Sequence, residues 1–319
     1  MNIVFCADRR VLPGLHVALY SVLERYEGKS RPDFTIFSDD LDEADQKLLA
    51  KSLDSLRKPY GLEIRRVDAG LFAGFPQLNG SWATYYRLLI PSMLDANRFL
   101  YLDADILCDL DVSQLANLDM GEAPAGFVSE APLSGCADRA VAKLLGASPD
   151  EPYFNAGIML VNAVEWRRQQ ISEQALDFLR NYPAAYWDQS ALNFVLYRKS
   201  YQLDERFNTI VNMRKHWPAL KMPVGSLNRL LHFVDYPKPW DLGAEFIHPQ
   251  YGQWRRLLEK TEVKNFRSWQ ATPARKFPTT AKAKTGYLKA ARDKILFSLY
   301  YYGILKIIKG IIISNEKPI

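Results

Sequence analysis

The sequence predicts an α/β protein with one large domain, built on a doubly wound and mostly parallel sheet with flanking helices, and a basic C-terminal tail. Strand-like and helix-like segments alternate over the first 67 residues. The length of 319 residues and the 48% hydrophobic content are enough for a large core. Charge is uneven: residues 255–319 hold 15 Lys and Arg against 4 Asp and Glu, and the rest holds 26 against 32.

Strands and helices alternate in the first part of the chain. Continuous or alternating apolar residues predict strands at 2–7, 33–38 and 62–67. Helical spacing of apolar residues predicts helices at 13–27 and 41–57, and Pro13 suits the first turn of a helix. This order favours parallel strands joined by right-handed connections.

The most informative stretch is 98–108, a short apolar run that ends in Asp103 and Asp105. Alternate side chains of an extended strand point the same way, so these two carboxylates can aim into one cleft and hold a divalent cation. Two other Asp-x-Asp pairs, at 40–42 and 109–111, are typical of loops and helix starts. Only the first pair ends an apolar strand.

The segments on either side of the acid pair carry further polar candidates. Arg87 lies in a helix-like segment at 82–90, where a solvated or capping arginine is the alternative interpretation. Glu130 ends a strand-like run. Asn155 and Gly157 open the next apolar run, where they could meet a ligand or form an ordinary turn before a strand.

The end of the predicted body carries an acid, a histidine and a lysine. Asp188 opens a predicted helix, as a helix cap or as a substrate contact. His232 follows an apolar pair, where a lone histidine is usually a core residue. Pro237 and Pro239 favour an extended loop that presents Lys238, a suitable counter-charge for phosphate.

Glycine-rich nucleotide loops are absent from the sequence. No G-x-G-x-x-G follows the first predicted strand, and no G-x-x-x-x-G-K-[S/T] occurs. The charge of a bound diphosphate would therefore have to be met by a metal ion and by Lys or Arg.

The cysteines and the N-terminus favour a cytoplasmic protein. Cys6, Cys108 and Cys136 are odd in number and form no C-x-x-C pair, as expected for reduced thiols. The chain enters a strand-like run directly after Met1, without a basic leader, so we expect no signal peptide.

The basic tail predicts attachment to an anionic membrane surface rather than to nucleic acid. Its apolar stretch at 295–313 is short and contains two lysines and two glycines, whereas a spanning helix needs about 20 mostly apolar residues. An interfacial segment fits better, and a helix packed on the body is the alternative. We therefore expect a domain at 1–255 and a membrane-associating tail at 256–319, with peripheral attachment to the inner face of the cytoplasmic membrane.

Seven motifs in order resemble the family 8 retaining glycosyltransferases, and most closely the lipopolysaccharide α-galactosyltransferase type. The resemblance covers about residues 1–255 and implies a GT-A type fold. The motifs are Phe5-Cys-Ala-Asp8, Phe72-Ala-Gly-Phe-Pro76, Thr84-Tyr-Tyr-Arg87-Leu, Tyr101-Leu-Asp-Ala-Asp105, Tyr153-Phe-Asn-Ala-Gly157, Asp188-Gln189 and His232 through Lys238-Pro-Trp240.

The resemblance also implies a set of site residues. Asp103, Asp105 and His232 would hold Mn²⁺, with Mg²⁺ as the alternative ion; an imidazole ligand suits Mn²⁺ better. Asp8 would accept the uracil N–H of a UDP-hexose, and Lys238 would bind its diphosphate. The residues implied around the donor and its sugar are Ala7, Arg87, Ala104, Glu130, Asn155, Gly157, Asp188 and Gln189.

Two positions depart from the family pattern. Asp235 stands where the family usually has a glycine close to the diphosphate, and Glu130 stands where the galactosyltransferases tend to have aspartate. Asp235 is thus expected to affect the binding of the diphosphate, and Glu130 to affect which sugar is bound.

The resemblance implies transfer of galactose or glucose from a UDP-sugar to a saccharide acceptor of lipopolysaccharide or another cell-surface glycan, with retention of configuration. Gln189, Asp188 and Asn155 are the catalytic candidates. A neutral amide is a poor nucleophile, which favours attack by the acceptor on the face of the leaving diphosphate. The alternatives are a metal-dependent nucleotidyltransferase or phosphohydrolase, and a non-catalytic membrane-associated module that binds UDP-sugars.

Overall fold

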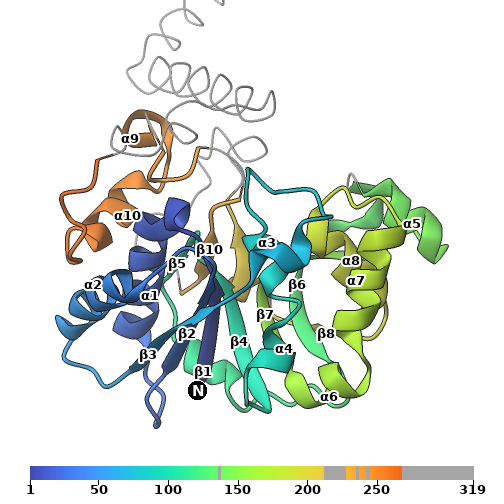
Figure 1. Cartoon of the computed structure of the whole chain (residues 1–319), viewed down its shortest axis with the longest axis horizontal. Coiled ribbons are helices and arrows are strands. Elements are labelled where there is room, and N and C mark those ends of the chain that lie inside the picture. Colours follow the sequence, from blue (N-terminus) through green and yellow to red (C-terminus); the bar gives the residue numbers. More distant parts are fainter. Residues whose placement is uncertain (136–137, 212–227, 235–236, 242–243, 268–319) are drawn as a thin grey trace, which may run out of the picture. The chain divides into compact units, whose positions relative to one another are not determined.

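The structure is a computed structural model that describes residues 1–135, 138–211, 228–234, 237–241 and 244–267 (Figure 1). Contacts divide the chain into two compact units. The first unit consists of Met1–Ile210, Ser226–His232 and Arg256–Asn265. The second consists of Val211–Gly225, Phe233–Arg255 and Phe266–Ile319.

A seven-stranded sheet forms the centre of the first unit. Its order is β3 (Gly61–Arg66), β2 (Asp33–Ser38), β1 (Asn2–Cys6), β4 (Arg98–Asp103), β7 (Pro152–Asn162), β6 (Ala125–Pro132) and β8 (Tyr201–Gln202). Neighbouring strands are parallel except that β7 runs antiparallel to both β4 and β6. The predicted mostly parallel α/β sheet is therefore confirmed.

The reversed direction of β7 positions the site. Strands β1 and β4 both end at one edge of the sheet, where Cys6 is paired with Asp103. Because β7 runs the opposite way, its middle lies beside the end of β4, with Ile158 opposite Leu102. Residues that precede Ile158 in β7 and residues at the end of β4 thus lie at the same edge of the sheet.

Helices cover both faces of this sheet (Figure 1). They are α1 (Leu12–Arg25), α2 (Glu43–Asp54), α3 (Ala83–Tyr86), α4 (Ile90–Met93), α5 (Arg139–Leu145), α6 (Ala163–Arg168), α7 (Ile171–Asn181) and α8 (Trp187–Val195). Successive residues of a strand face opposite sides, so Phe5 packs in a core with α1 and α2, whereas Val4 packs in a second core with α3, α4 and α6 to α8.

Two local predictions differ from the structure. The helix expected at 82–90 is divided into two short helices, α3 and α4, and Arg87 follows the first of them. The alternative of a turn at Asn155 and Gly157 is wrong, because β7 already begins at Pro152, where it pairs with Pro132 of β6. Both residues lie within the buried strand.

A small second sheet carries His232. It joins β5 (Ile106–Cys108), β10 (Leu230–His232) and β9 (Thr209–Ile210), with β10 antiparallel to β5 and parallel to β9. The register places His232 opposite Ile106, the residue that follows Asp105. Strand pairing therefore brings two segments more than 100 residues apart to one point.

The described part of the second unit contains α9 (Ala244–Ile247) and most of α10 (Tyr251–Leu258). The rings of Trp240 and Trp254 pack with centroids 6.0 Å apart. The tail from residue 268 onward, including the predicted interfacial segment, lies outside the described residues. In the part that is described, no helix is long and apolar enough to cross a membrane.

A buried histidine at the interface of α1 and α2 makes stability depend on pH. Nδ1 of His16 lies 3.0 Å from Oγ of Ser52, and burial lowers the pKa of His16 to about 3. The unfolded chain takes up this proton near pH 6.5, so the free energy of unfolding falls as the pH drops from 6.5 towards 3.

We expect His16→Gln to weaken this dependence, because glutamine keeps a polar group beside Ser52 but does not titrate. Between pH 7 and pH 5 the variant should lose about 2 kcal/mol less stability than the wild type. Urea unfolding at both pH values measures this, and equal losses in the two proteins would contradict it.

Candidate metal centre and donor site

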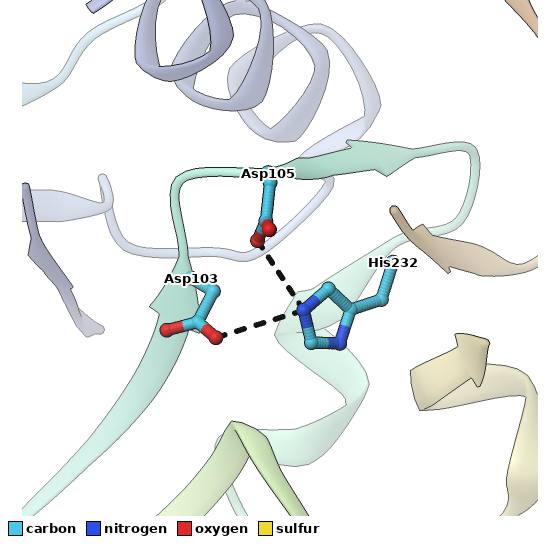
Figure 2. Close-up of side chains that lie close together, drawn as sticks. All are labelled: Asp103, Asp105 and His232. Carbon is cyan, nitrogen blue, oxygen red and sulfur yellow. Dashed lines mark ion pairs between the residues drawn. The ribbon is translucent and has the colours of Figure 1, made fainter. Parts of the chain in front are cut away.

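Three potential metal ligands meet at the edge of the central sheet (Figure 2). Asp103 ends β4, Asp105 precedes β5 and His232 ends β10. Nε2 of His232 lies 3.6 Å from Oδ2 of Asp103 and 3.2 Å from Oδ1 of Asp105. Two carboxylates and one imidazole form a ligand set that suits Mn²⁺ and similar divalent cations. These residues fit a single bound cation, and the identity of the ion stays a prediction.

The close approach of these groups depends on Gly157. A Cβ atom on this residue would lie 2.1 Å from Cε1 of His232 and 2.7 Å from Oδ2 of Asp103. Any side chain at position 157 would thus displace the imidazole or the carboxylate. The glycine is needed for space, because β7 passes directly beside the ligand group.

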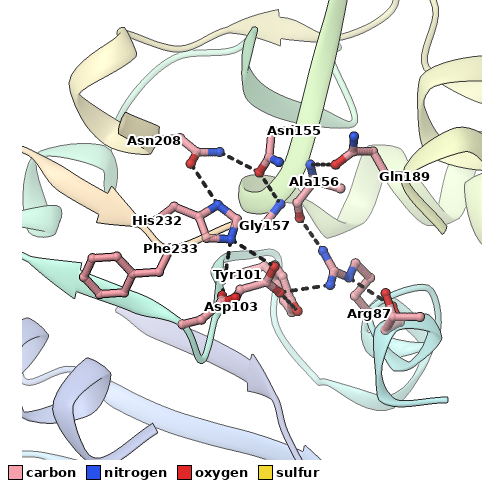
Figure 3. A network of polar contacts seen from close by, with 12 residues as sticks. Arg87, Tyr101, Asp103, Asn155, Ala156, Gly157, Gln189, Asn208, His232 and Phe233 are labelled. Atoms are coloured by element: carbon pink, nitrogen blue, oxygen red, sulfur yellow. Dashed lines mark hydrogen bonds and ion pairs between the residues drawn. The ribbon is translucent and has the colours of Figure 1, made fainter. Parts of the chain in front are cut away.

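Arg87 is buried between two acids (Figure 3). Its Nη2 donates to Oδ1 of Asp103 at 2.9 Å, and its Nε lies 3.0 Å from Oδ2 of Asp188. Nη1 donates to the carbonyl oxygen of Ala156 at 2.5 Å, and the guanidinium lies over the ring of Tyr101. The alternative of a solvated arginine is wrong, since a buried cation needs these partners. The alternative of a capping arginine is confirmed, because Arg87 is the C-cap residue of α3 and its Nε donates to the carbonyl oxygen of Thr84 at 3.0 Å.

Asp188 is a buried partner of Arg87 and not a helix cap. The N-cap of α8 is Tyr186, which makes no side-chain capping bond, and the hydroxyl of Thr84 donates to Asp188. Burial raises the pKa of Asp188 to about 6, although Arg87 and Thr84 act in the opposite direction. The preceding Trp187 has a left-handed backbone with φ 49°, which is strained for a bulky residue.

Gln189 is tied to the start of β7. Its Oε1 accepts a hydrogen bond from the backbone N–H of Ala156 at 3.1 Å. Ala156 thus contacts both Gln189 and Arg87, through its two backbone polar groups. The amide oxygen of Gln189 therefore already has one donor within the protein.

A chain of polar contacts runs from Glu130 through two amides to His232, and Figure 3 shows its part from Asn155 to His232. Nδ2 of Asn155 donates to Oε2 of Glu130 at 3.3 Å, and Nδ2 of Asn208 donates to Oδ1 of Asn155 at 2.9 Å. Oδ1 of Asn208 lies 3.1 Å from Nδ1 of His232. Asn155 and Glu130, two predicted donor contacts, are thus connected to the imidazole.

Asp8 lies just beyond β1 and is paired with Arg10. Its carboxylate accepts from the backbone N–H of Arg10 at 2.9 Å and from Nη2 at 2.6 Å. Burial alone would raise the pKa of Asp8, but Arg10 outweighs it and holds this pKa below its usual value. Nη1 of Arg10 also donates to the carbonyl oxygen of Asn79 at 2.5 Å.

The remaining predicted site residues occupy three places. Ala7 and Ala104 are both buried in the first unit. Ala7 precedes Asp8 in the sequence, and Ala104 lies between Asp103 and Asp105. Lys238 belongs to the second unit, where its ammonium donates to the carbonyl oxygen of Phe233. Asp235 lies outside the described residues.

Three polar contacts were not predicted from the sequence, those of Thr84, Tyr101 and Asn208. The hydroxyl of Tyr101 donates to Oδ1 of Asp103 at 2.5 Å. From the sequence, Tyr101 is expected to be a core residue, because it lies in an apolar strand. Asn208 ends a short 3-10 helix far from any predicted motif. Thr84 belongs to a quoted motif, but nothing local indicates that it binds Asp188.

A mostly parallel α/β sheet with an acid pair at its edge, joined there by a histidine from a small second sheet, is the arrangement of a GT-A type glycosyltransferase. The fold is shared with the crystal structure of the galactosyltransferase LgtC in complex with donor and acceptor sugar analogs, with TM-score 0.68 and 24% identity. That alignment covers 82% of this chain and 96% of LgtC.

The family model described as glycosyl transferase family 8 matches residues 2–243, and the chain belongs to this family. A lipopolysaccharide 1,3-galactosyltransferase of Salmonella typhimurium is 30% identical over 78% of this chain and 76% of its own length. The lipopolysaccharide glucosyltransferase WaaO of Escherichia coli is 28% identical over 75% of this chain and 72% of its own. The protein is therefore a glycosyltransferase.

Gly157→Ala tests the role of the close approach at β7. The added methyl group must displace His232 or Asp103, so we expect the affinity for Mn²⁺ to fall at least about tenfold. Isothermal titration calorimetry without any donor measures this affinity. Gly252→Ala, where no atom lies within 4 Å of the new Cβ, is the control and should bind as the wild type does. Equal affinities for all three proteins would refute the prediction.

Proposed function

We propose that the protein is a retaining hexosyltransferase that moves galactose or glucose from a UDP-sugar to a saccharide acceptor of lipopolysaccharide or another cell-surface glycan, with Mn²⁺ as its cofactor. The observation that carries this proposal is the group formed by Asp103, Asp105 and His232 at the sheet edge. Membership of family 8 and the names of two similar proteins, a galactosyltransferase and a glucosyltransferase, support the sugar class.

In the proposed site, a metal ion and a lysine together offset the negative charge of the donor diphosphate. A divalent cation held by the acid pair and the histidine would offset the charge that develops on the departing diphosphate. Lys238 is the protein cation proposed for the same phosphates, and Asp8 is proposed to accept the N–H of the uracil. Arg87 orients Asp103 and Asp188 by direct contact with both.

Retention is proposed to follow from attack by the acceptor on the face of the leaving diphosphate. Asp188 is buried, its Oδ1 accepts from Thr84, and its Oδ2 has an ion pair with Arg87 but no hydrogen bond to any described residue. The oxygen of Gln189 accepts from Ala156. Neither group is placed as an unengaged nucleophile, and we assign Gln189 to steadying the positive charge on the sugar. Asn155 is proposed to support this pocket from β7.

Asp103→Asn tests the metal-dependent function. We expect it to lower Mn²⁺-dependent turnover of UDP-galactose and UDP-glucose at least about 100-fold, because a ligand and a charge are removed from the proposed metal site. Release of UDP measures turnover. Asp111→Asn is the matched control, since Asp111 belongs to another Asp-x-Asp pair and caps a 3-10 helix. Free sugar 1-phosphate as the only product would favour the nucleotidyltransferase or phosphohydrolase alternative, and donor binding without turnover would favour the binding module.

Gln189→Ala tests the assignment of attack on the leaving-group face. Loss of a group that steadies positive charge should lower kcat about 10- to 100-fold and leave KM for the donor nearly unchanged. Mass spectrometry of the protein after incubation with donor provides the decisive check. A sugar attached covalently to residue 188 or 189 would overturn the proposal.

We also propose that the protein is cytoplasmic and that residues 256–319 attach it to the inner face of the cytoplasmic membrane. The support is the charge asymmetry of the sequence. Deletion of residues 276–319 should release the protein from vesicles that contain anionic lipid and leave transfer to a soluble acceptor largely intact. Vesicle sedimentation measures the first effect, and unchanged sedimentation of the truncated protein would refute the idea.

A further inference from the structure

We propose that Asn155 and Asn208 form a relay that keeps a proton on Nδ1 of His232 and so presents Nε2 to the metal ion. The relay starts at the backbone N–H of Gly157 (Figure 3). Both asparagines are positioning residues that act through His232. The inference rests on the metal role proposed above.

The direction of the relay is fixed at Gly157. An amide side chain can turn end for end, but a backbone N–H always donates. The N–H of Gly157 lies 3.0 Å from Oδ1 of Asn155, so this atom must be the oxygen of Asn155. The group of Asn208 that lies 2.9 Å from the same oxygen must then be its amide nitrogen, because two oxygens would repel.

The second half of the relay follows from the first. With its nitrogen directed at Asn155, Asn208 turns its oxygen to Nδ1 of His232, at 3.1 Å. An amide oxygen can only accept, so Nδ1 must carry hydrogen. The lone pair of Nε2 is then free to face the cation that Asp103 and Asp105 would hold.

Burial makes this order hard to reverse. Asn155, Asn208 and His232 are 6%, 3% and 3% exposed, so water cannot readily replace a mismatched partner. Nδ2 of Asn155 also donates to Oε2 of Glu130, which agrees with the direction set at Gly157. Reversing both amides would bring together two donors at Gly157 and two acceptors at Glu130.

The relay also changes what Asn155 can offer a ligand. Its side-chain oxygen already accepts from Gly157 and Asn208, while its nitrogen donates to Glu130. We therefore assign the main role of Asn155 to holding the metal site in order. The sequence interpretation placed it directly at the donor sugar.

The first experiment measures the Mn²⁺ dissociation constant of the full chain by electron paramagnetic resonance, without donor or acceptor. Asn208→Leu removes the acceptor for Nδ1 and should weaken Mn²⁺ binding about 10- to 100-fold. Asn208→Asp keeps an acceptor for Nδ1 but loses the donor to Asn155, so it should lose clearly less Mn²⁺ affinity than Asn208→Leu. Wild-type affinity in Asn208→Leu, or equal losses in both variants, would overturn the relay.

A matched control separates the relay from a general loss of packing. Asn193 is also a buried asparagine, and it accepts from the backbone of Phe154 at 2.8 Å and donates to its carbonyl oxygen at 2.9 Å. Asn193→Leu removes buried hydrogen bonds beside β7 but no contact with His232, and its Mn²⁺ affinity should stay within about threefold of the wild type. A loss equal to that of Asn208→Leu would count against the relay.

A second experiment needs no variant in the relay. The metal-free wild-type protein is labelled with ¹⁵N-histidine and its NMR spectrum is recorded at pH 8. We expect Nδ1 of His232 to show a directly bonded proton. The His232→Gln variant identifies the signals of His232, because they are missing from its spectrum. A bare Nδ1 would overturn the inference. Since neither experiment measures glycosyl transfer, a protein that transfers no sugar would contradict the proposed function and leave the relay standing.

Discussion

The buried guanidinium of Arg87 is the constraint on which the site depends. A cation in the interior needs paired charges, and Arg87 has them in Asp103 from β4 and Asp188 from α8. The hydroxyl of Tyr101 donates to the same oxygen of Asp103 as Arg87 does. One oxygen of Asp103 is thereby held by the protein, and the other is directed at His232.

The same pairing links two layers of the fold. Asp103 belongs to the central sheet, and Asp188 lies in a helix that packs against it. Because Arg87 also donates to the backbone of β7, the end of β4, the start of β7 and the start of α8 are held in one arrangement. The three candidate metal ligands are therefore placed by contacts that extend well beyond the group itself.

The sequence predicted the features that local patterns encode. The strand at 33–38 has the predicted bounds, the one predicted at 2–7 ends one residue earlier, and the one predicted at 62–67 is shifted by one residue. These bounds are predictable because apolar periodicity is a property of neighbouring residues. The acid pair was recognised because two carboxylates at the end of an apolar strand are unusual. The pairs at 40–42 and 109–111 indeed cap helices, through Asp42 and Asp111.

The features that were missed depend on contacts between distant segments. Nothing near Asn208 indicates that it binds His232, because the partners meet only through the small sheet of β5, β10 and β9. The cap assigned to Asp188 follows its residue type and position, but tertiary pairing with Arg87 overrides that local preference. The reversal of β7, which places Gly157 against the imidazole, has no local signature either.

The pairing of Asp8 with Arg10 has a consequence for selectivity. An incoming N–H donor at Asp8 must share or replace hydrogen bonds that Arg10 already makes. The net gain is then the difference between two similar interactions, which is small. If Asp8 binds the donor as we propose, a ligand without an N–H would leave the Arg10 pair untouched but gain nothing there, so this position would select among ligands more than it would strengthen their binding.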